Sequence, residues 1–243
     1  MKILSIGNSF SQDAHKWLHK LAITQGQKME TVNLYIGGCS LQTHWENVEQ
    51  DRANYDLEIN GGEGVRKISI REALEMDQWD VITLQQVSHL SGIPGSYEPY
   101  FSNLLQYVKA AQPEAKIFFH ETWAYEQDSQ HPNFPNYDRD QRKMYECVIT
   151  TTDAVAARYQ LPKIPTGRAI QYLRENVAEF DYQKTGFSLC RDGFHLRYDY
   201  GRYAAACVWY ATLTGVKVVP GPFEGFDEET LEIIANTINR ICG

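Results

Sequence analysis

The stretch KILSIGNSFS, residues 2–11, joins a short apolar strand to a turn that carries a serine. Lys2–Ile6 has the length and composition of a buried strand, and Gly7–Ser11 follows it as a turn. From about Gln12 the apolar side chains return at the spacing of one helix face, and we expect Ser11 to cap this helix. A strand, a turn and a helix in this order form the first unit of an α/β fold.

The same alternation continues along the chain. Further strands are expected at Thr31–Ile36, Asp80–Leu84, Ala115–His120 and Leu161–Ile164, and helices at Leu41–Gln50, Ile70–Met76, Tyr100–Ala111, Arg139–Tyr159, Tyr198–Thr214 and Glu228–Ile241. The pattern predicts a three-layer α/β/α fold of the flavodoxin-like type. Its parallel sheet should have about five strands in the order 2-1-3-4-5.

Two short segments interrupt this alternation. Tyr55–Ile59 and Val65–Ile70 flank the glycine-rich segment Asn60–Gly64, a pattern typical of a β-hairpin. We interpret residues 54–70 as a hairpin insertion over one end of the sheet. The insertion belongs to a single domain that spans residues 1–243.

The charge and the cysteines argue against several classes of protein. A formal net charge of -8 disfavours nucleic acid or an anionic membrane surface as partner, and it is compatible with a neutral or cationic small substrate. The five cysteines form no C-x-x-C pair, which is typical of reduced thiols in the cytoplasm. We find no signal peptide and no membrane-spanning segment. A chain with its signal peptide removed would look the same, so a periplasmic or secreted location stays open, as does the oligomeric state.

Polar residues and glycines gather where the predicted strands end. The segments concerned are Gly7–Ser9, Gly37–Gly38, Gln85–Gln86 and His120–Glu121. Open parallel sheets bind ligands outside the carboxyl ends of their strands. Ser9 would there precede a helix, whose first N–H groups stabilise a developing anion. The alternative is a turn serine that only satisfies local backbone groups.

A serine nucleophile needs a base, and Asp192-Gly193-Phe194-His195 offers one near the end of the chain. Histidine is the usual base near neutral pH, and a carboxylate on its second ring nitrogen holds it in one tautomer. Asp192 can fold back onto His195 across the glycine. Asp-x-x-His is a short pattern that arises by chance, so an ordinary loop histidine is the alternative.

Together these segments resemble the first and last blocks of the SGNH (GDSL-type) hydrolases. The resemblance implies that Ser9 is the nucleophile and that Asp192 and His195 complete the catalytic triad. The second block of that family places a glycine after the second strand, and its N–H lies in the oxyanion hole; Gly38 matches it. The implied activity is that of a serine ester hydrolase that works through an acyl-enzyme.

The block after the third parallel strand departs from the family. The family has Gly-x-Asn-Asp there, with the asparagine as an oxyanion donor, whereas this chain has Thr83-Leu84-Gln85-Gln86-Val87-Ser88-His89. A glutamine amide offers the same donor, so Gln86, or else Gln85, is expected to join the N–H groups of Ser9 and Gly38 in the oxyanion hole. The likeness is greatest to an uncharacterised bacterial branch of SGNH-like proteins with Gly-Asn-Ser-Phe-Ser and Leu-Gln-Gln motifs.

Other residues are expected to contact the substrate or to have no part in the site. We expect substrate-binding residues at the strand ends: Gln85, His89, Glu121 and Trp123. His15 and His19 have the i, i+4 spacing of metal ligands, but no third ligand is evident and we expect a solvated helix surface. We expect no metal and no cofactor, since no nucleotide-binding fingerprint follows the first strand.

The substrate implied by the resemblance is an O-acetylated carbohydrate, as in the sugar-deacetylating SGNH enzymes. One alternative is a lipase or thioesterase that acts on longer acyl chains. Another is a non-catalytic carbohydrate-binding protein on a hydrolase fold.

Overall fold

The protein is built on one seven-stranded sheet, in a computed structural model that describes residues 1–242. Across the sheet the strands are β4 (Gly64–Ile68), β3 (Tyr55–Ile59), β2 (Glu30–Tyr35), β1 (Lys2–Gly7), β5 (Val81–Leu84), β6 (Lys116–His120) and β7 (Lys163–Ile164). The run β2-β1-β5-β6-β7 is parallel throughout. It corresponds to the strand order 2-1-3-4-5 expected from the sequence, and the α/β/α fold is confirmed.

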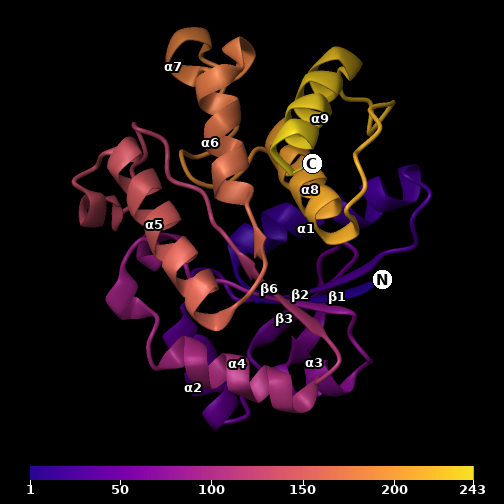
Figure 1. Cartoon of the computed structure of the whole chain (residues 1–243), viewed down its shortest axis with the longest axis vertical. Helices are drawn as coiled ribbons and strands as arrows, with labels where there is room; N and C mark the ends of the chain where they lie inside the picture. Colours follow the sequence, from indigo (N-terminus) through magenta and orange to yellow (C-terminus); the bar gives the residue numbers. More distant parts are fainter. Residues whose placement is uncertain (243) are drawn as a thin grey trace.

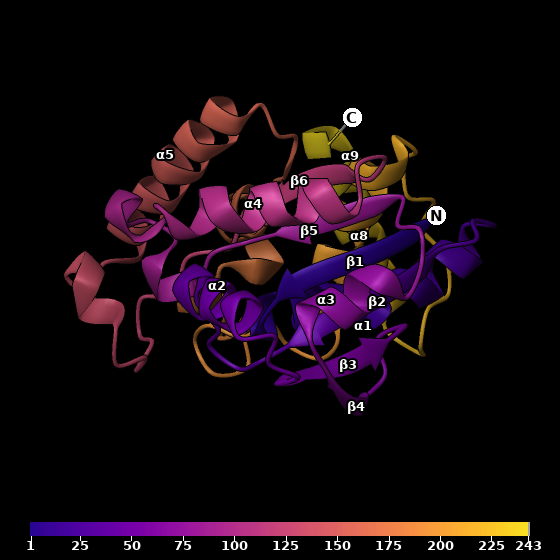
Figure 2. The same ribbon diagram turned by 90° about the horizontal axis from the view of Figure 1, so that it is seen from below.

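The hairpin lies at the edge of the sheet and not over its end. β3 pairs antiparallel with β2, and β4 pairs antiparallel with β3, so the sheet has seven strands instead of about five (Figure 2). The outer N–H and C=O groups of β2 need partners, and β3 supplies them. Tyr55 and Leu57 meanwhile bury their side chains against the core.

Helices cover both faces of the sheet. They are α1 (Ser9–Thr24), α2 (Leu41–Glu49), α3 (Ile70–Glu75), α4 (Tyr100–Ala111), α5 (Gln141–Tyr159), α6 (Thr166–Asn176), α7 (Tyr182–Thr185), α8 (Tyr200–Thr214) and α9 (Glu228–Cys242), with 3-10 turns η1 (Ser88–Leu90), η2 (Pro94–Ser96), η3 (Phe134–Tyr137) and η4 (Ala178–Phe180). Figure 1 shows α1, α6, α8 and α9 on one side and α2, α3 and α4 on the other.

Two apolar cores result, one on each side of the sheet. α8 is buried from Gly201 to Ala211 because it packs between α1 and α9. α6 was not expected from the sequence: polar Gln171 and Arg174 are buried on it beside the apolar residues, which obscures the helical period. Within residues 1–242 no helix combines the length and the apolar character needed to cross a bilayer.

The start of α1 differs from the prediction. The helix begins at Ser9 rather than near Gln12, and Asn8, not Ser11, is its N-cap. Asn8 Oδ1 accepts the N–H of Phe10 at 3.0 Å, and the Asn8 N–H donates to Ser11 Oγ at 3.0 Å. Ser9 is therefore the first residue of the helix, directly after the carboxyl end of β1.

His15 is not on a solvated surface, which corrects the sequence-based expectation. Its side chain is buried, and Nε2 lies 2.7 Å from Ser5 Oγ. The ring packs edge-on against Trp209 of α8, which covers this face of α1. Burial lowers the pKa of His15 to about 3, so the ring is neutral at physiological pH.

Candidate active site

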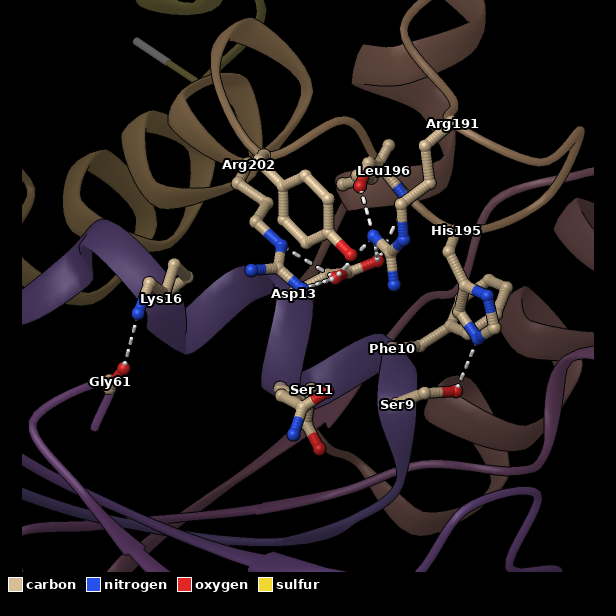
Figure 3. A network of polar contacts seen from close by, with 12 residues as sticks. Ser9, Phe10, Ser11, Asp13, Lys16, Gly61, Arg191, His195, Leu196 and Arg202 are labelled. Atoms are coloured by element: carbon tan, nitrogen blue, oxygen red, sulfur yellow. Dashed lines mark hydrogen bonds and ion pairs between the residues drawn. The ribbon is translucent and has the colours of Figure 1, made fainter. Parts of the chain in front are cut away.

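Ser9 and His195 are in contact although they come from opposite ends of the chain. Ser9 Oγ lies 2.9 Å from His195 Nε2, and His195 Nδ1 lies 2.7 Å from Asp192 Oδ2 (Figure 3). Ser9 stands at the end of β1, and Asp192 and His195 belong to the loop before α8. The distances are those of hydrogen bonds between a hydroxyl, an imidazole and a carboxylate.

The loop holds Asp192 and His195 together through its own backbone. Asp192 Oδ1 accepts the N–H groups of Phe194 at 3.2 Å and of His195 at 2.7 Å. Gly193, between them, has a φ of 82°, a conformation that favours glycine. The Asp-x-x-His spacing is therefore sufficient for the carboxylate to reach the imidazole.

The ionised state of Asp192 fixes the tautomer of His195. Burial raises the pKa of Asp192, but the hydrogen bonds from the His195 ring and backbone outweigh it, and the pKa lies below its usual value. An ionised carboxylate only accepts hydrogen bonds, so His195 Nδ1 carries the proton that it donates. Nε2 of the neutral ring is then left to accept the hydroxyl proton of Ser9.

A cavity of about 290 Å³ opens over Ser9, and we call it the Ser9 cavity. Ser9 and Gly38 line this cavity, and their backbone N–H groups have no hydrogen-bond partner among residues 1–242. Gly38 has a φ of 66°, in the region that favours glycine. The other residues that line the Ser9 cavity are Asn8, Phe10, Tyr35, Gly37, Val87, Ser88, His89, His131, Phe194 and His195.

The side-chain amide of Gln86 forms hydrogen bonds with backbone groups of neighbouring segments. Its Nε2 donates to the carbonyl of Ser96 at 3.0 Å, and its Oε1 accepts the N–H groups of Leu41 at 3.0 Å and of Val87 at 2.8 Å. Gln86 does not line the Ser9 cavity. In this structure it joins neighbouring loops, because these backbone groups would otherwise be buried without partners.

Gln85 is also buried, in a polar chain beneath the turn that carries Ser9. Its Nε2 donates to Asn8 Oδ1 at 2.8 Å, and its Oε1 accepts from His120 Nδ1 at 2.7 Å. Asn8 Nδ2 then donates to the carbonyl of Cys39 at 3.0 Å. The chain connects β6 to both turns that border the Ser9 cavity. Gln85 therefore helps to hold the two turns in place, and it does not line the Ser9 cavity.

Two further residues expected to bind substrate are also enclosed. Glu121 is fully buried, its carboxylate pairs with Lys163 at 2.6 Å, and it accepts the backbone N–H of Arg168 at the start of α6. Trp123 is fully buried beneath the site, where its ring stacks on Phe10 with centroids 4.1 Å apart. Both correct the prediction, because a residue at a strand end can point into the core as well as out of it.

His89 does line the Ser9 cavity, and it faces a histidine that the sequence did not indicate. The rings of His89 and His131 lie 5.7 Å apart between centroids. Burial lowers the pKa of both, and for His131 the nearby His89 and His195 add to the effect. Both imidazoles are thus neutral at physiological pH. His131 comes from the irregular segment before α5, where no strand end or helix period marks it.

A buried carboxylate ties α1 to the loop of His195. Asp13 is fully buried, and its Oδ1 lies 3.1 Å from Arg191 Nη1 and 2.7 Å from Arg202 Nε. Its Oδ2 accepts the backbone N–H of Leu196 at 2.7 Å. Figure 3 shows the carboxylate between the two guanidinium groups, beside the pair Ser9–His195. Asp13 lies one helical turn beyond Ser9, so it positions the loop relative to Ser9.

Comparison with solved structures defines the class of the fold. A protein from Slackia heliotrinireducens, provisionally described as an SGNH hydrolase, matches with a TM-score of 0.60 at 20% identity over 88% of this chain and 98% of its own. Axe2, an acetylxylan esterase from Geobacillus stearothermophilus, matches with a TM-score of 0.52 at 12% identity over 86% of this chain and 90% of its own. The chain has the fold of the SGNH hydrolases.

A match to a family model identifies the family of the chain. The model described as domain of unknown function (DUF4886) matches residues 2–239, and the chain belongs to this family. A solved DUF4886 family protein from Bacteroides uniformis is 36% identical, with a TM-score of 0.90 over 99% of this chain and 93% of its own. No curated protein matches the sequence.

The Asp13 cluster predicts a large loss of stability in Asp13→Asn. Removing one partner of a buried ion pair costs about 3–5 kcal/mol, because the remaining charge stays buried without compensation. The melting temperature should fall by an amount on the order of 10 °C. The matched control is Asp56→Asn, which removes a half-exposed carboxylate that pairs with Lys67 at 2.9 Å and should change the melting temperature little. Equal melting temperatures of the two variants would contradict the proposed role of Asp13.

Proposed function

We propose that the protein is a serine ester hydrolase that acts through an acyl-enzyme on O-acetylated carbohydrates. The proposal rests above all on one observation: Ser9 Oγ, His195 Nε2, His195 Nδ1 and Asp192 Oδ2 form a continuous line of hydrogen bonds at the Ser9 cavity. The fold, which is that of the SGNH hydrolases, supports the same reaction class by analogy.

In the proposed reaction His195 acts first as base and then as acid. Nε2 takes the proton of Ser9 while Oγ attacks the ester carbonyl, and the carbonyl oxygen becomes an oxyanion. As the tetrahedral intermediate collapses, the bond to the alkoxy oxygen breaks and His195 returns the proton to it. A water molecule then attacks the acyl-enzyme with the same help, which releases the acid and restores Ser9. Asp192 stabilises the imidazolium at each step.

For the oxyanion we propose three donors: the N–H groups of Ser9 and Gly38, and the ring of His89. The two N–H groups are supported by the place of Ser9 and Gly38 in the lining of the Ser9 cavity, and by their lack of a hydrogen-bond partner within residues 1–242. His89 takes the place first expected for Gln86, because the Gln86 amide is bonded to Ser96. A neutral imidazole carries one N–H, and no hydrogen bond from a His89 ring nitrogen is formed within residues 1–242.

The size of the Ser9 cavity supports a short acyl group. Its volume of about 290 Å³ lies at the lower end of ligand sites, and Phe10 and Phe194 form part of its wall. A lipase or thioesterase would need an apolar channel for the remainder of a long chain. An acetyl group fits the size of the cavity, and the likeness of the fold to an acetylxylan esterase is compatible with a carbohydrate acetate.

The first test is labelling of the nucleophile. We expect a fluorophosphonate to modify Ser9, as mapped by peptide mass spectrometry, and Ser9→Ala to lose hydrolysis of p-nitrophenyl acetate while it keeps the wild-type melting temperature. The matched control is Ser102→Ala on α4, whose hydroxyl bonds to the carbonyl of Pro99 away from the site. A folded Ser9→Ala protein with wild-type turnover would overturn the proposal and leave a carbohydrate-binding role.

The second test concerns the third oxyanion donor. His89→Phe keeps the ring but removes its N–H, so kcat should fall by about 100–1,000-fold with little change in KM. His131→Phe, the same replacement in the facing ring, should have a much smaller effect. Gln86→Met should lower the melting temperature and change kcat only a few-fold, because Gln86 joins loops. An equal loss in the two histidine variants would assign the effect to packing and not to a hydrogen bond.

A further inference from the structure

A second cavity adjoins the Ser9 cavity, and we call it the side cavity. Its volume is about 530 Å³, and the lining residues used below are Gln12, Lys16, Tyr35, Glu58, Arg191 and Tyr198. Tyr35 lines both cavities, so they share a wall. Arg191 immediately precedes Asp192, so the side cavity is bounded by the same loop that holds the triad.

Helix α1 forms a floor that runs from one cavity to the next. Ser9, Gln12 and Lys16 are spaced i, i+3 and i+7, which places them along one face of the helix. At a rise of about 1.5 Å per residue, Gln12 lies roughly 4.5 Å and Lys16 roughly 10 Å beyond Ser9 along the axis. In Figure 3 the Asp13 cluster lies between the pair Ser9–His195 and the pair Lys16–Gly61. The two cavities therefore follow one another along α1.

The side cavity offers both donors and acceptors. The ammonium group of Lys16 has three N–H donors, and one of them donates to the carbonyl of Gly61 at 3.1 Å. Arg191 bonds to Asp13 through Nη1, and within residues 1–242 its Nε and Nη2 form no hydrogen bond. The carboxylate of Glu58 accepts from Asn33 at 2.8 Å and from Gln12, and burial raises its pKa.

These charges are balanced. The acids Asp56, Glu58 and Glu63 line the cavity with Lys16, Arg191 and Arg202. Asp13 pairs with both arginines and Lys67 pairs with Asp56, so four acids are matched by four bases. A cavity of this kind does not select an anion or a cation. It matches a neutral ligand whose hydroxyl groups both donate and accept hydrogen bonds.

Tyr198 adds a fixed aromatic surface at the rim. It is 64% exposed, which is unusual for a large aromatic side chain. The guanidinium groups of Arg191 and Arg202 lie 4.8 Å and 4.6 Å from its ring centroid, and its carbonyl accepts from Trp17 Nε1 at 2.8 Å. A ring held in this way loses little entropy when a second ring packs against it.

We propose that the side cavity binds the alcohol part of the ester, a neutral sugar, while the Ser9 cavity holds the acetyl group. This inference rests on the proposed function and adds the location of the sugar. Hydroxyl groups of the sugar bond to Lys16, Arg191 and Glu58, and Tyr198 contacts an apolar edge of a sugar ring. The residues of the side cavity thus determine which acetate is hydrolysed and have no part in the bond-breaking steps.

The test compares two kinds of substrate in the full chain. p-Nitrophenyl acetate reports on the Ser9 cavity alone, and acetylated methyl xyloside and methyl glucoside report on both cavities. In Lys16→Met and Tyr198→Ala, kcat/KM for the better glycoside should fall about tenfold, mainly through KM, because a charge-assisted hydrogen bond or a ring contact is lost. Hydrolysis of p-nitrophenyl acetate should stay within about twofold.

Matched controls are Lys109→Met on α4 and Tyr172→Ala on α6, where Tyr172 is 42% exposed outside both cavities. They should leave both activities unchanged. The inference is overturned if the side-cavity variants keep full activity on the glycosides, if they lose both activities alike, or if the wild type hydrolyses p-nitrophenyl acetate but neither glycoside. Failure of the proposed function is distinct: the wild type would then hydrolyse none of these esters and Ser9 would not be labelled.

Discussion

The buried carboxylate of Asp13 is the constraint on which the geometry of the site depends. An ion of this kind costs several kcal/mol to remove from water, and the cost is offset only when opposite charges and hydrogen bonds surround it. Arg191, Arg202 and the N–H of Leu196 meet that condition together. Since Asp13 and Ser9 belong to one rigid helix, satisfying the carboxylate also sets the distance from Ser9 to the loop that follows Arg191.

A second polar network lies beneath the turn that carries Ser9. His120, Gln85 and Asn8 form a chain in which each side chain makes at least two hydrogen bonds. The chain ends at the carbonyl of Cys39. A buried network of this kind is stabilising only when it is fully satisfied, so it allows few alternative arrangements. The turn of Ser9 and the turn of Gly38 are therefore held relative to each other before any ligand binds, as electrostatic stabilisation of an oxyanion requires.

Helix α1 organises both cavities. Its first residue, Ser9, borders the smaller cavity, and its next turns border the larger and more polar one. The division is the basis of the proposal that a short acyl group lies on one side and a hydroxyl-rich alcohol on the other. It also separates the groups proposed to break the bond from those proposed to select the substrate, so that the second set can vary without disturbing the first.

The sequence by itself determined the five parallel strands and the position of Ser9 after β1, because strand and helix periods are local signals. The order of these strands followed from the general rules for α/β sheets. It also indicated the contact of Asp192 with His195, which needs only a glycine turn between them. Only the tertiary structure decided that β3 pairs with β2, that Gln85, Glu121 and Trp123 are enclosed, that His131 faces His89, and that Asp13 pairs with Arg191 and Arg202. These contacts join segments far apart in the chain, and the burial of a polar side chain depends on packing by distant elements, which leaves no periodic trace in the sequence.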